Sequence, residues 1–300
     1  MSNARPILSV LIPYFGDDPS QLIAALDAQQ VSQTEIILYD DGSEKPDITA
    51  RVQASATSAK LPVQNIIASQ NKGRSAARNC LVDAAKGQYL LFLDADMLPE
   101  DETFLQIYLD LIKSTRPAIV FGGFSVLPTT VDRSTDLHRA LSAGSDCLDA
   151  KTRKLVPAKH VCSSNLLVRD DVLRDCPFDT DFVGWGWEDV EWAARAFEQF
   201  AITHIDNPAV HLGLESAETL VRRYRDSAAN YAKFVARHPQ LAKQLPSYRT
   251  AKLAGRIPGL KLLRPVLASL VRDPWHLVPM KLRIFALKLW RAGWYAEALT

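Results

Sequence analysis

The chain has 300 residues, of which 47% are hydrophobic and 23% are charged, and its formal net charge is +1. These values are those of an average globular protein and exclude a disordered, collagenous or coiled-coil chain. The length suits one large α/β domain, alone or with an appendage.

Strand and helix patterns alternate through the first half of the chain. Short apolar runs predict strands at 7–14, 35–43, 63–67, 88–96 and 118–124. Apolar residues at helical spacing predict helices at 20–30, 73–86 and 101–114. Because alternating strands and helices form right-handed βαβ units, the pattern predicts an α/β fold with a mostly parallel sheet flanked by helices.

The second half has a less regular pattern. Weak periodicity predicts a loop or insertion at 129–159. Strands are expected at 161–169 and 201–206, a helix at 188–200 and one long amphipathic helix at 215–238. Prolines then break the chain into short helical pieces, so we predict a catalytic domain at 1–245 and a helical tail at 246–300.

The predicted tail differs from the rest of the chain in charge. Residues 246–300 contain ten Lys and Arg and two acidic residues, whereas the remaining residues contain 25 basic and 32 acidic side chains. Two interpretations follow: the tail makes a peripheral contact with an anionic membrane surface, or it is an appendage that packs on the acidic body. Binding of nucleic acid is not expected.

The cysteines and the hydropathy pattern predict a cytoplasmic protein. Cys80, Cys147, Cys162 and Cys176 form no C-x-x-C pair and match no zinc template, so reduced thiols are expected. The first residues lack the apolar region of a signal peptide, and no apolar run is long enough to span a membrane. Attachment at the inner face of the membrane remains compatible with this pattern.

Polar residues follow the predicted strands at the end where open parallel sheets bind ligands. The first strand ends in Pro13, Tyr14 and Phe15, and the fourth in Asp94-Ala95-Asp96. Asp94 and Asp96 leave an extended segment on the same side, and a divalent cation resolves their repulsion, so Mn²⁺ or Mg²⁺ is expected. The alternative is that both carboxylates cap a turn before the next helix.

The segment NKGRSAARN at 71–79 opens a predicted helix. Gly73 permits a tight turn, and the helix N-terminus favours an anion. Arg74 and Arg78 are four residues apart and share a helix face, which suits a diphosphate. The alternative is two solvated arginines. The segment is neither a dinucleotide-binding fingerprint nor a P-loop.

The segment GWGWEDVEW at 184–192 combines indoles with carboxylates. Trp185, Gly186 and Trp187 precede Glu188 and Asp189, which begin a predicted helix. Aromatic faces pack on sugars and a carboxylate can deprotonate a hydroxyl, so the segment indicates a sugar site. The alternative is that acidic residues simply favour the first turn of a helix.

Two further residues are candidates on weaker patterns. His211 is a possible third metal ligand, with a structural histidine as the alternative. Asn165 is a possible sugar contact, with a turn residue as the alternative.

Four motifs in this order, YDDGS, NKGRSAARN, FLDAD and GWGWEDVEW, resemble inverting family-2 glycosyltransferases with the GT-A fold. The resemblance covers about 7–213, and the last motif is similar to the W-G-x-E-D segment of galactosyltransferase-like and chondroitin-polymerase-like members. It implies a donor pocket for a nucleotide-sugar, most simply a UDP-sugar, with Asp41 bonding the nucleobase. The donor-binding positions are then Pro13, Tyr14, Phe15, Asp41, Gly73, Arg74, Arg78, Asp94, Ala95 and Asp96.

The resemblance also implies a mechanism. Asp94 and Asp96, with His211, would hold the metal on the diphosphate, and Asp189 would be the general base, with Glu188 positioning hydroxyls. The acceptor would be a glycan or a lipid-linked glycan, and inversion would take place in one displacement. This requires both acidic motifs to line one cleft. Membrane-spanning helices and the Q-x-x-R-W signature of processive synthases are not found, which favours transfer of one or few sugars.

Two other function classes remain alternatives. A nucleotidyltransferase that makes nucleotide sugars also uses a parallel sheet and metal-binding aspartates, but it predicts a basic Gly-rich loop after the first strand, and residues 14–18 offer none. A non-catalytic glycan-binding module would need neither the arginines of 71–79 nor the Asp94/Asp96 pair.

Overall fold

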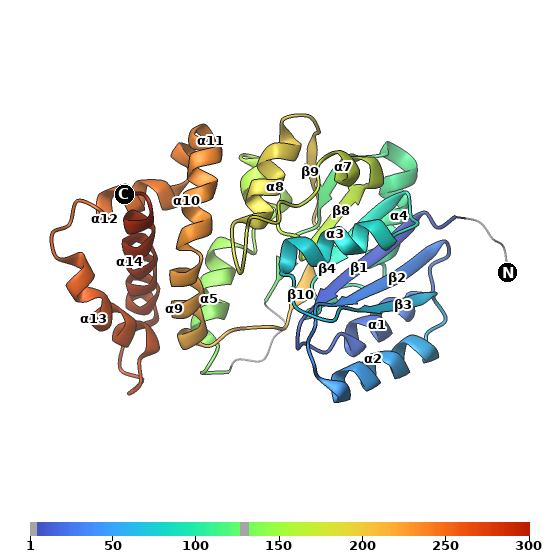
Figure 1. Ribbon diagram of the computed structural model, residues 1–300, viewed down its shortest axis with the longest axis horizontal. Coiled ribbons are helices and arrows are strands. Elements are labelled where there is room, and N and C mark those ends of the chain that lie inside the picture. The colour runs from blue at the N-terminus through green and yellow to red at the C-terminus, as the bar shows by residue number, and fades with distance from the viewer. Residues whose placement is uncertain (1–4, 127–131) are drawn as a thin grey trace.

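The structure is a computed structural model that describes residues 5–126 and 132–300. Its main sheet has seven strands in the order β3-β2-β1-β4-β8-β6-β9 (Figure 1). The strands are β1 (Leu8–Tyr14), β2 (Thr34–Asp40), β3 (Val63–Ile67), β4 (Tyr89–Leu93), β6 (Ile119–Phe121), β8 (Asn165–Arg169) and β9 (Ile202–His204). Only β8 runs antiparallel to its neighbours, so the predicted mostly parallel sheet is confirmed.

Helices cover both faces of this sheet. Alternating side chains of β1 point to opposite layers, with Val10 and Ile12 in one apolar core and Leu11 in the other. The first layer contains α1 (Ser20–Asp27), α2 (Pro46–Ser58) and α4 (Phe104–Thr115). The second contains α3 (Arg74–Ala84), α7 (Asp170–Asp175) and α8 (Glu188–Phe197). All helices predicted in the first half are present, with ends shifted by up to three residues.

A second, smaller sheet was not predicted from the sequence. It has the order β5-β10-β7 and consists of β5 (Met97–Pro99), β10 (Ala209–His211) and β7 (Phe124–Ser125). Because β10 pairs antiparallel with β5, His211 lies opposite Met97, next to the Asp94–Asp96 segment.

Seven further helices of the described residues form the end of the molecule that lies farthest from β2 and β3 (Figure 1). They are α5 (Asp136–Ser145), α9 (Ala217–Asp226), α10 (Ala228–Arg237), α11 (Pro239–Gln244), α12 (Pro246–Ala254), α13 (Leu260–Arg272) and α14 (Met280–Ala298). The tail is helical, as predicted, although Pro265 lies inside α13 without ending it.

Two predictions for this half were wrong. The segment 215–238 is not one helix, because Ser227 separates α9 from α10 and turns its hydroxyl to the Tyr224 carbonyl. The segment 129–159 is not a loop: beyond 129–131, which lie outside the described residues, it forms α5, α6 (Ala150–Arg153) and the start of a 3₁₀ turn, η1 (Pro157–His160).

The tail packs on the rest of the chain. Leu137 of α5 and Leu220 of α9 share an apolar core with α13 and α14, and the Trp290 indole donates to the Val221 carbonyl (3.0 Å). The predicted boundary at 245/246 stays a prediction, although helices on both sides of it contribute to one core. No helix in 5–126 or 132–300 has the length and apolarity needed to cross a membrane.

Candidate active site

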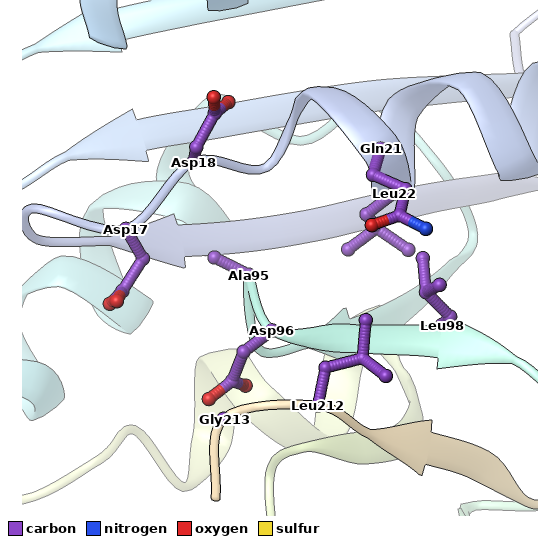
Figure 2. Close-up of a pocket in the computed structure, with 9 residues that line it drawn as sticks. All are labelled: Asp17, Asp18, Gln21, Leu22, Ala95, Asp96, Leu98, Leu212 and Gly213. Carbon is purple, nitrogen blue, oxygen red and sulfur yellow. The ribbon is translucent and has the colours of Figure 1, made fainter. Parts of the chain in front are cut away.

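The carboxyl ends of three neighbouring parallel strands meet at one edge of the main sheet. Tyr14 at the end of β1 lies beside Asp40 at the end of β2, and β4, on the other side of β1, leads directly into Asp94. A pocket of about 210 Å³ opens at this edge, lined by Asp17, Asp18, Gln21, Leu22, Ala95, Asp96, Leu98, Leu212 and Gly213 (Figure 2). The sheet topology therefore gathers the polar strand ends that the sequence singled out.

Arg78 connects the two acidic motifs. Its guanidinium lies 3.4 Å from Asp94 Oδ1, 3.7 Å from Glu188 Oε1 and 3.6 Å from Asp189 Oδ1. Burial would lower the pKa of this guanidinium, but the three carboxylates raise it above its usual value. The FLDAD and GWGWEDVEW segments, about 90 residues apart, therefore face one site.

The same contacts correct the prediction for Arg78 itself. Its side chain is only 1% exposed, so it lies under the site and is not presented to a diphosphate. Arg74, one turn earlier on α3, is partly exposed, and its charge favours lower pKa values for the carboxyls of Asp17 and Asp96. Of the two predicted arginines, Arg74 is the one that an anion can reach.

Glu188 and Asp189 occupy different environments at the start of α8. Glu188 is buried, and this burial, together with repulsion from Asp189, raises the pKa of its carboxyl despite the nearby Arg78. The Asp189 side chain is 20% exposed, and its Oδ2 accepts a hydrogen bond from the Ser163 backbone N–H (3.2 Å). Asp189 is therefore the acid of the pair that a bound hydroxyl can approach.

The loop before α8 has a left-handed backbone. Gly184, Gly186 and the non-glycine Trp187 have φ angles of 82°, 95° and 76°. Asn230 of α10 holds this loop by donating to the carbonyls of Val183 and Gly186, each at 3.0 Å. In GWGW the two glycines thus permit the positive φ angles of the loop, and the two tryptophans supply its aromatic side chains.

The two indoles of this loop have different surroundings. The Trp187 ring packs against Tyr231, Phe234 and Tyr295, and its Nε1 donates to the Tyr295 hydroxyl (3.0 Å). Trp187 is thus held by aromatic neighbours but keeps partial exposure, and its predicted contact with a sugar stays a prediction. Trp185 instead lies against Tyr224 of α9, and the Arg223 guanidinium lies over its ring, 5.7 Å from the centroid.

Asp96 and His211 are brought together by the small sheet. His211 Nε2 lies 3.3 Å from Asp96 Oδ2, and a Cβ at Gly213 would overlap the Asp96 carboxylate. Burial would raise the pKa of Asp96, but the hydrogen bond and charge of His211 lower it. Burial likewise would lower the pKa of His211, and Asp96 raises it. Gly213 is therefore required for the close approach of the two groups.

These donors match a hard divalent cation in type. Mg²⁺ and Mn²⁺ bind proteins through one or two side chains and complete their coordination with phosphate oxygens and water. Asp96 and His211 supply an oxygen and a nitrogen in contact, whereas Asp94 Oδ1 is paired with Arg78. Within 5–126 and 132–300, no group of three or more His, Cys, Asp or Glu side chains is arranged so that it could hold a metal ion.

Several charged residues around the pocket were missed by sequence reasoning. Asp17 lies on the pocket wall near Asp96, while Asp18 points away from it (Figure 2). Burial and then the charge of Asp96 raise the pKa of Asp17, and Arg74, Lys45 and Arg223 oppose the shift. Asp17 and Asp96 thus line the pocket, and the charges of three surrounding cations act on Asp17. Carboxylates with nearby cations suit a metal–diphosphate pair. His138 of α5 packs edge-on against His211, with ring centroids 5.6 Å apart.

Asp41 holds the loop that precedes α3. Its Oδ1 accepts from the Lys72 backbone N–H and its Oδ2 from the Gly73 backbone N–H, each at 2.8 Å. The predicted contact of Asp41 with a nucleobase would have to use the lone pairs that these bonds leave. Gly73 has a φ of 89°, as its predicted turn requires, and begins α3.

The remaining predicted donor positions lie along the same edge. Pro13 and Tyr14 end β1, and the Tyr14 hydroxyl donates to Asn65 Oδ1 (3.2 Å). Phe15 follows with 54% of its side chain exposed, and Ala95 lines the pocket.

Asn165 is not part of the site. It is fully buried, its Nδ2 donates to the carbonyls of Gly123 (2.7 Å) and Asn207 (2.8 Å), and its Oδ1 accepts from the Tyr108 hydroxyl (2.7 Å). The predicted sugar contact is therefore wrong, because these bonds occupy the amide inside the molecule.

Comparison with solved structures shows the same fold as glycosyltransferases. S. aureus TarS has a TM-score of 0.55 at 14% identity, with 97% of this chain and 90% of that chain covered. The mannosyltransferase PcManGT from Pyrobaculum calidifontis, solved with GDP-Man and Mn²⁺, has a TM-score of 0.58 at 18% identity, with 97% and 87% covered. The predicted GT-A architecture is confirmed by these neighbours.

Sequence comparison gives the family. The glycosyltransferase AglE of Haloferax volcanii is 28% identical over 201 residues, covering 65% of this chain and 63% of AglE. The uncharacterised glycosyltransferase YibD of Escherichia coli is 33% identical over 110 residues, covering 36% and 30%. The chain thus spans less than two thirds of the length of these curated relatives. Residues 9–176 match Glycosyl transferase family 2, and the chain belongs to this family of enzymes.

Proposed function

We propose that the protein is a metal-dependent, inverting glycosyltransferase that moves a hexosyl group from a nucleotide-sugar to a hydroxyl of a glycan or lipid-linked glycan. The observation that carries the proposal is the buried Arg78, whose guanidinium lies within 3.7 Å of carboxylates from both acidic motifs. A donor at Asp96 and an acceptor at Asp189 would then share one cleft.

The donor in this proposal is a UDP-sugar. Its diphosphate would lie near Arg74, Arg223 and Lys45, the cations that act on the pocket carboxyls. TarS has been solved with UDP and with UDP-GlcNAc, and PcManGT with GDP-Man, so uridine and guanosine donors are the first two to compare.

Asp189 is the proposed general base. It would take the proton of the acceptor hydroxyl, and that oxygen would attack the anomeric carbon from the face opposite the departing diphosphate, which inverts the configuration. Glu188 would position hydroxyls, and Trp185 would pack on a sugar ring. A divalent cation held by Asp96 and His211 would neutralise charge on the leaving diphosphate.

The class of acceptor determines where in the cell the enzyme would work. A lipid-linked glycan would require the enzyme to work at the inner face of a membrane, and the ten basic residues of 246–300 would favour a peripheral contact there.

Thermal shift separates the three function classes. We expect UDP with Mn²⁺ to raise the melting temperature more than GDP or TDP with Mn²⁺, and more than UDP alone. A nucleotidyltransferase would instead respond to a nucleoside triphosphate and a sugar phosphate. A glycan-binding module would respond to glycans without nucleotide or metal.

Asp189→Asn tests the base. Transfer should fall by about 10²-fold or more, while the UDP–Mn²⁺ thermal shift is retained, because the amide cannot accept the proton. Asp175→Asn, which alters an exposed acid on α7, is the matched control. Full activity in Asp189→Asn would remove Asp189 from this role.

A further inference from the structure

The C-terminal helices expose apolar side chains outside any core. Trp275 and Leu277, in the loop between α13 and α14, are 77% and 82% exposed. Leu263 and Val266 of α13, and Leu282 and Phe285 of α14, are 43–60% exposed. We call these six residues the tail surface. Exposed apolar groups of this number mark an interaction site when they are contiguous.

Helix geometry places the residues of the tail surface on two neighbouring helices and the loop that joins them. The two helices run side by side, since Arg264 donates to the Gly293 carbonyl (3.0 Å) and Arg283 to the Val271 carbonyl (3.1 Å). Leu263 and Val266 are three residues apart and share a face of α13, as Leu282 and Phe285 do on α14.

Both faces point away from the catalytic body. Arg272 ties α13 to Glu218 of α9, and Arg283 ties α14 to Asp136 of α5. These arginines lie about 130–150° around their helices from the exposed apolar pairs. The apolar pairs therefore lie on the side of these two helices that is turned away from α9 and α5. The helices α13 and α14 themselves lie at the end of the molecule opposite β2 and β3 (Figure 1).

The loop that carries Trp275 and Leu277 is held in place. Asp273 is buried, and its Oδ1 accepts from the backbone N–H groups of Leu277 (2.8 Å) and Val278 (3.1 Å). The loop therefore has a defined shape that presents its two large apolar side chains outward.

The charges around the tail surface are one-sided. Lys281 and Lys288 lie seven residues apart on α14, are exposed, and make no ion pair among the described residues. The two acids of 246–300 are engaged, Asp273 by its loop and Glu297 by Lys261 and Arg264. A partner that matches this surface would be anionic, with an apolar layer that accepts Trp and Leu.

We propose that the tail surface docks onto an anionic lipid bilayer, with Trp275 and Leu277 entering the interface and the lysines contacting headgroups. A bilayer supplies both required chemistries, negative headgroups above an apolar interior. A second copy of this chain fits less well, because its own Lys281 and Lys288 would approach those of the first. The link between this docking and a lipid-linked acceptor rests on the proposed function. The docking itself can be measured without catalysis.

Sedimentation with vesicles tests the proposal. The full chain should pellet with vesicles of phosphatidylcholine mixed equally with phosphatidylglycerol, less at high salt, and weakly with phosphatidylcholine alone. Trp275→Ser with Leu277→Ser should weaken binding about tenfold or more. Lys281→Gln with Lys288→Gln should weaken it by about 25-fold on mixed vesicles only.

Leu155→Ser, which alters an equally exposed leucine distant in sequence from the tail, is the matched control and should bind like the wild type. The proposal is overturned if the wild type does not bind mixed vesicles, or if both double variants bind them as strongly as the wild type does. A dimer that dissociates in the Trp275→Ser, Leu277→Ser variant also overturns it, in favour of a second copy. Hydrolysis of the sugar donor in vesicle-free buffer should be the same in all variants. If the transferase proposal fails, this hydrolysis is absent while vesicle binding is unaffected.

Discussion

Arg78 balances the charge of three carboxylates in a place that water hardly reaches. Removing one partner of a buried ion pair leaves uncompensated charge and costs about 3–5 kcal/mol. We therefore expect Arg78→Met to lose that much unfolding free energy in urea and to lose transfer activity. Arg78→Lys should recover part of the stability, because it keeps the charge but cannot reach all three acids. A loss below about 1 kcal/mol in Arg78→Met would contradict this account.

Gly213 offers a second test at the scale of one residue. A methyl group there would displace the Asp96 carboxylate from His211. Gly213→Ala should therefore weaken the Mn²⁺-dependent part of the UDP thermal shift and lower activity about tenfold or more, with little change in overall stability. Gly144→Ala is the control, since a Cβ there meets nothing within 4 Å and replaces a helical glycine. Unchanged metal dependence in Gly213→Ala would exclude this role for the glycine.

The sequence predicted those site residues that share a local motif. Asp94, Asp96, Glu188 and Asp189 lie in short patterns at the end of a strand or the start of a helix, so the local sequence singled them out, and the family resemblance assigned them to one cleft. Asp17 was passed over because it follows the first strand as an ordinary loop acid.

Residues whose roles depend on distant partners could not be predicted. Arg223 and His138 enter the site from α9 and α5, and no local pattern connects those helices to β4. Trp187 and Asn165 were assigned to sugar, because a sequence does not reveal that Tyr295 and Tyr108 occupy their polar atoms.

At the scale of elements, the loop before α8 depends on two helices far along the chain. Asn230 of α10 holds its carbonyls, and the Tyr295 hydroxyl of α14 accepts from Trp187 and shares a hydrogen bond with Ser227 (2.9 Å). Asp189, the proposed base, follows this loop closely, so its position depends on the tail.

Tyr295→Phe tests this dependence. The substitution keeps the ring stacked on Tyr231 but leaves the Trp187 N–H without its acceptor, which should cost about 1–3 kcal/mol of unfolding free energy. Transfer should fall further than donor hydrolysis, because acceptor activation depends on the loop more than donor binding does. Tyr248→Phe, in the same helical region, is the comparison. Equal activities in both variants would show that the loop does not need the hydroxyl.

Sequence patterns missed the helices α2 and α5 and several elements that are short or interrupted. The strands β5, β7 and β10 have two or three residues, too few for an alternating pattern to register. The break at Ser227 lies inside a continuous amphipathic stretch, and the contacts of its hydroxyl with the Tyr224 carbonyl and with Tyr295 of α14 are not visible in the sequence. The long strands of the main sheet carried strong signals because both of their faces are buried.

At the scale of the whole molecule, buried histidines make stability depend on pH. Burial, followed by the charge of Arg153, lowers the pKa of His204 from 6.5 to about 4, and burial likewise lowers the pKa of His160 to about 4. Between these values the unfolded chain binds protons that the folded chain does not, so the free energy of unfolding falls as pH falls from 6.5 towards 4. Urea unfolding across that range should show the decline.

His204→Gln should reduce this slope, since glutamine does not titrate and retains a donor towards the Pro157 carbonyl. His276→Gln, which alters an exposed histidine, is the matched control. An unchanged slope in His204→Gln would assign the acid sensitivity to other groups.

The hydrogen bond between Trp187 and Tyr295 joins residues 108 positions apart, one on each side of the predicted domain boundary. Its consequence concerns chimeras between family members. A C-terminal segment taken from a relative would have to supply a tyrosine hydroxyl in the same register for this indole. A chimera that exchanges the C-terminal segment to change substrate specificity should therefore exchange the 183–187 loop as well.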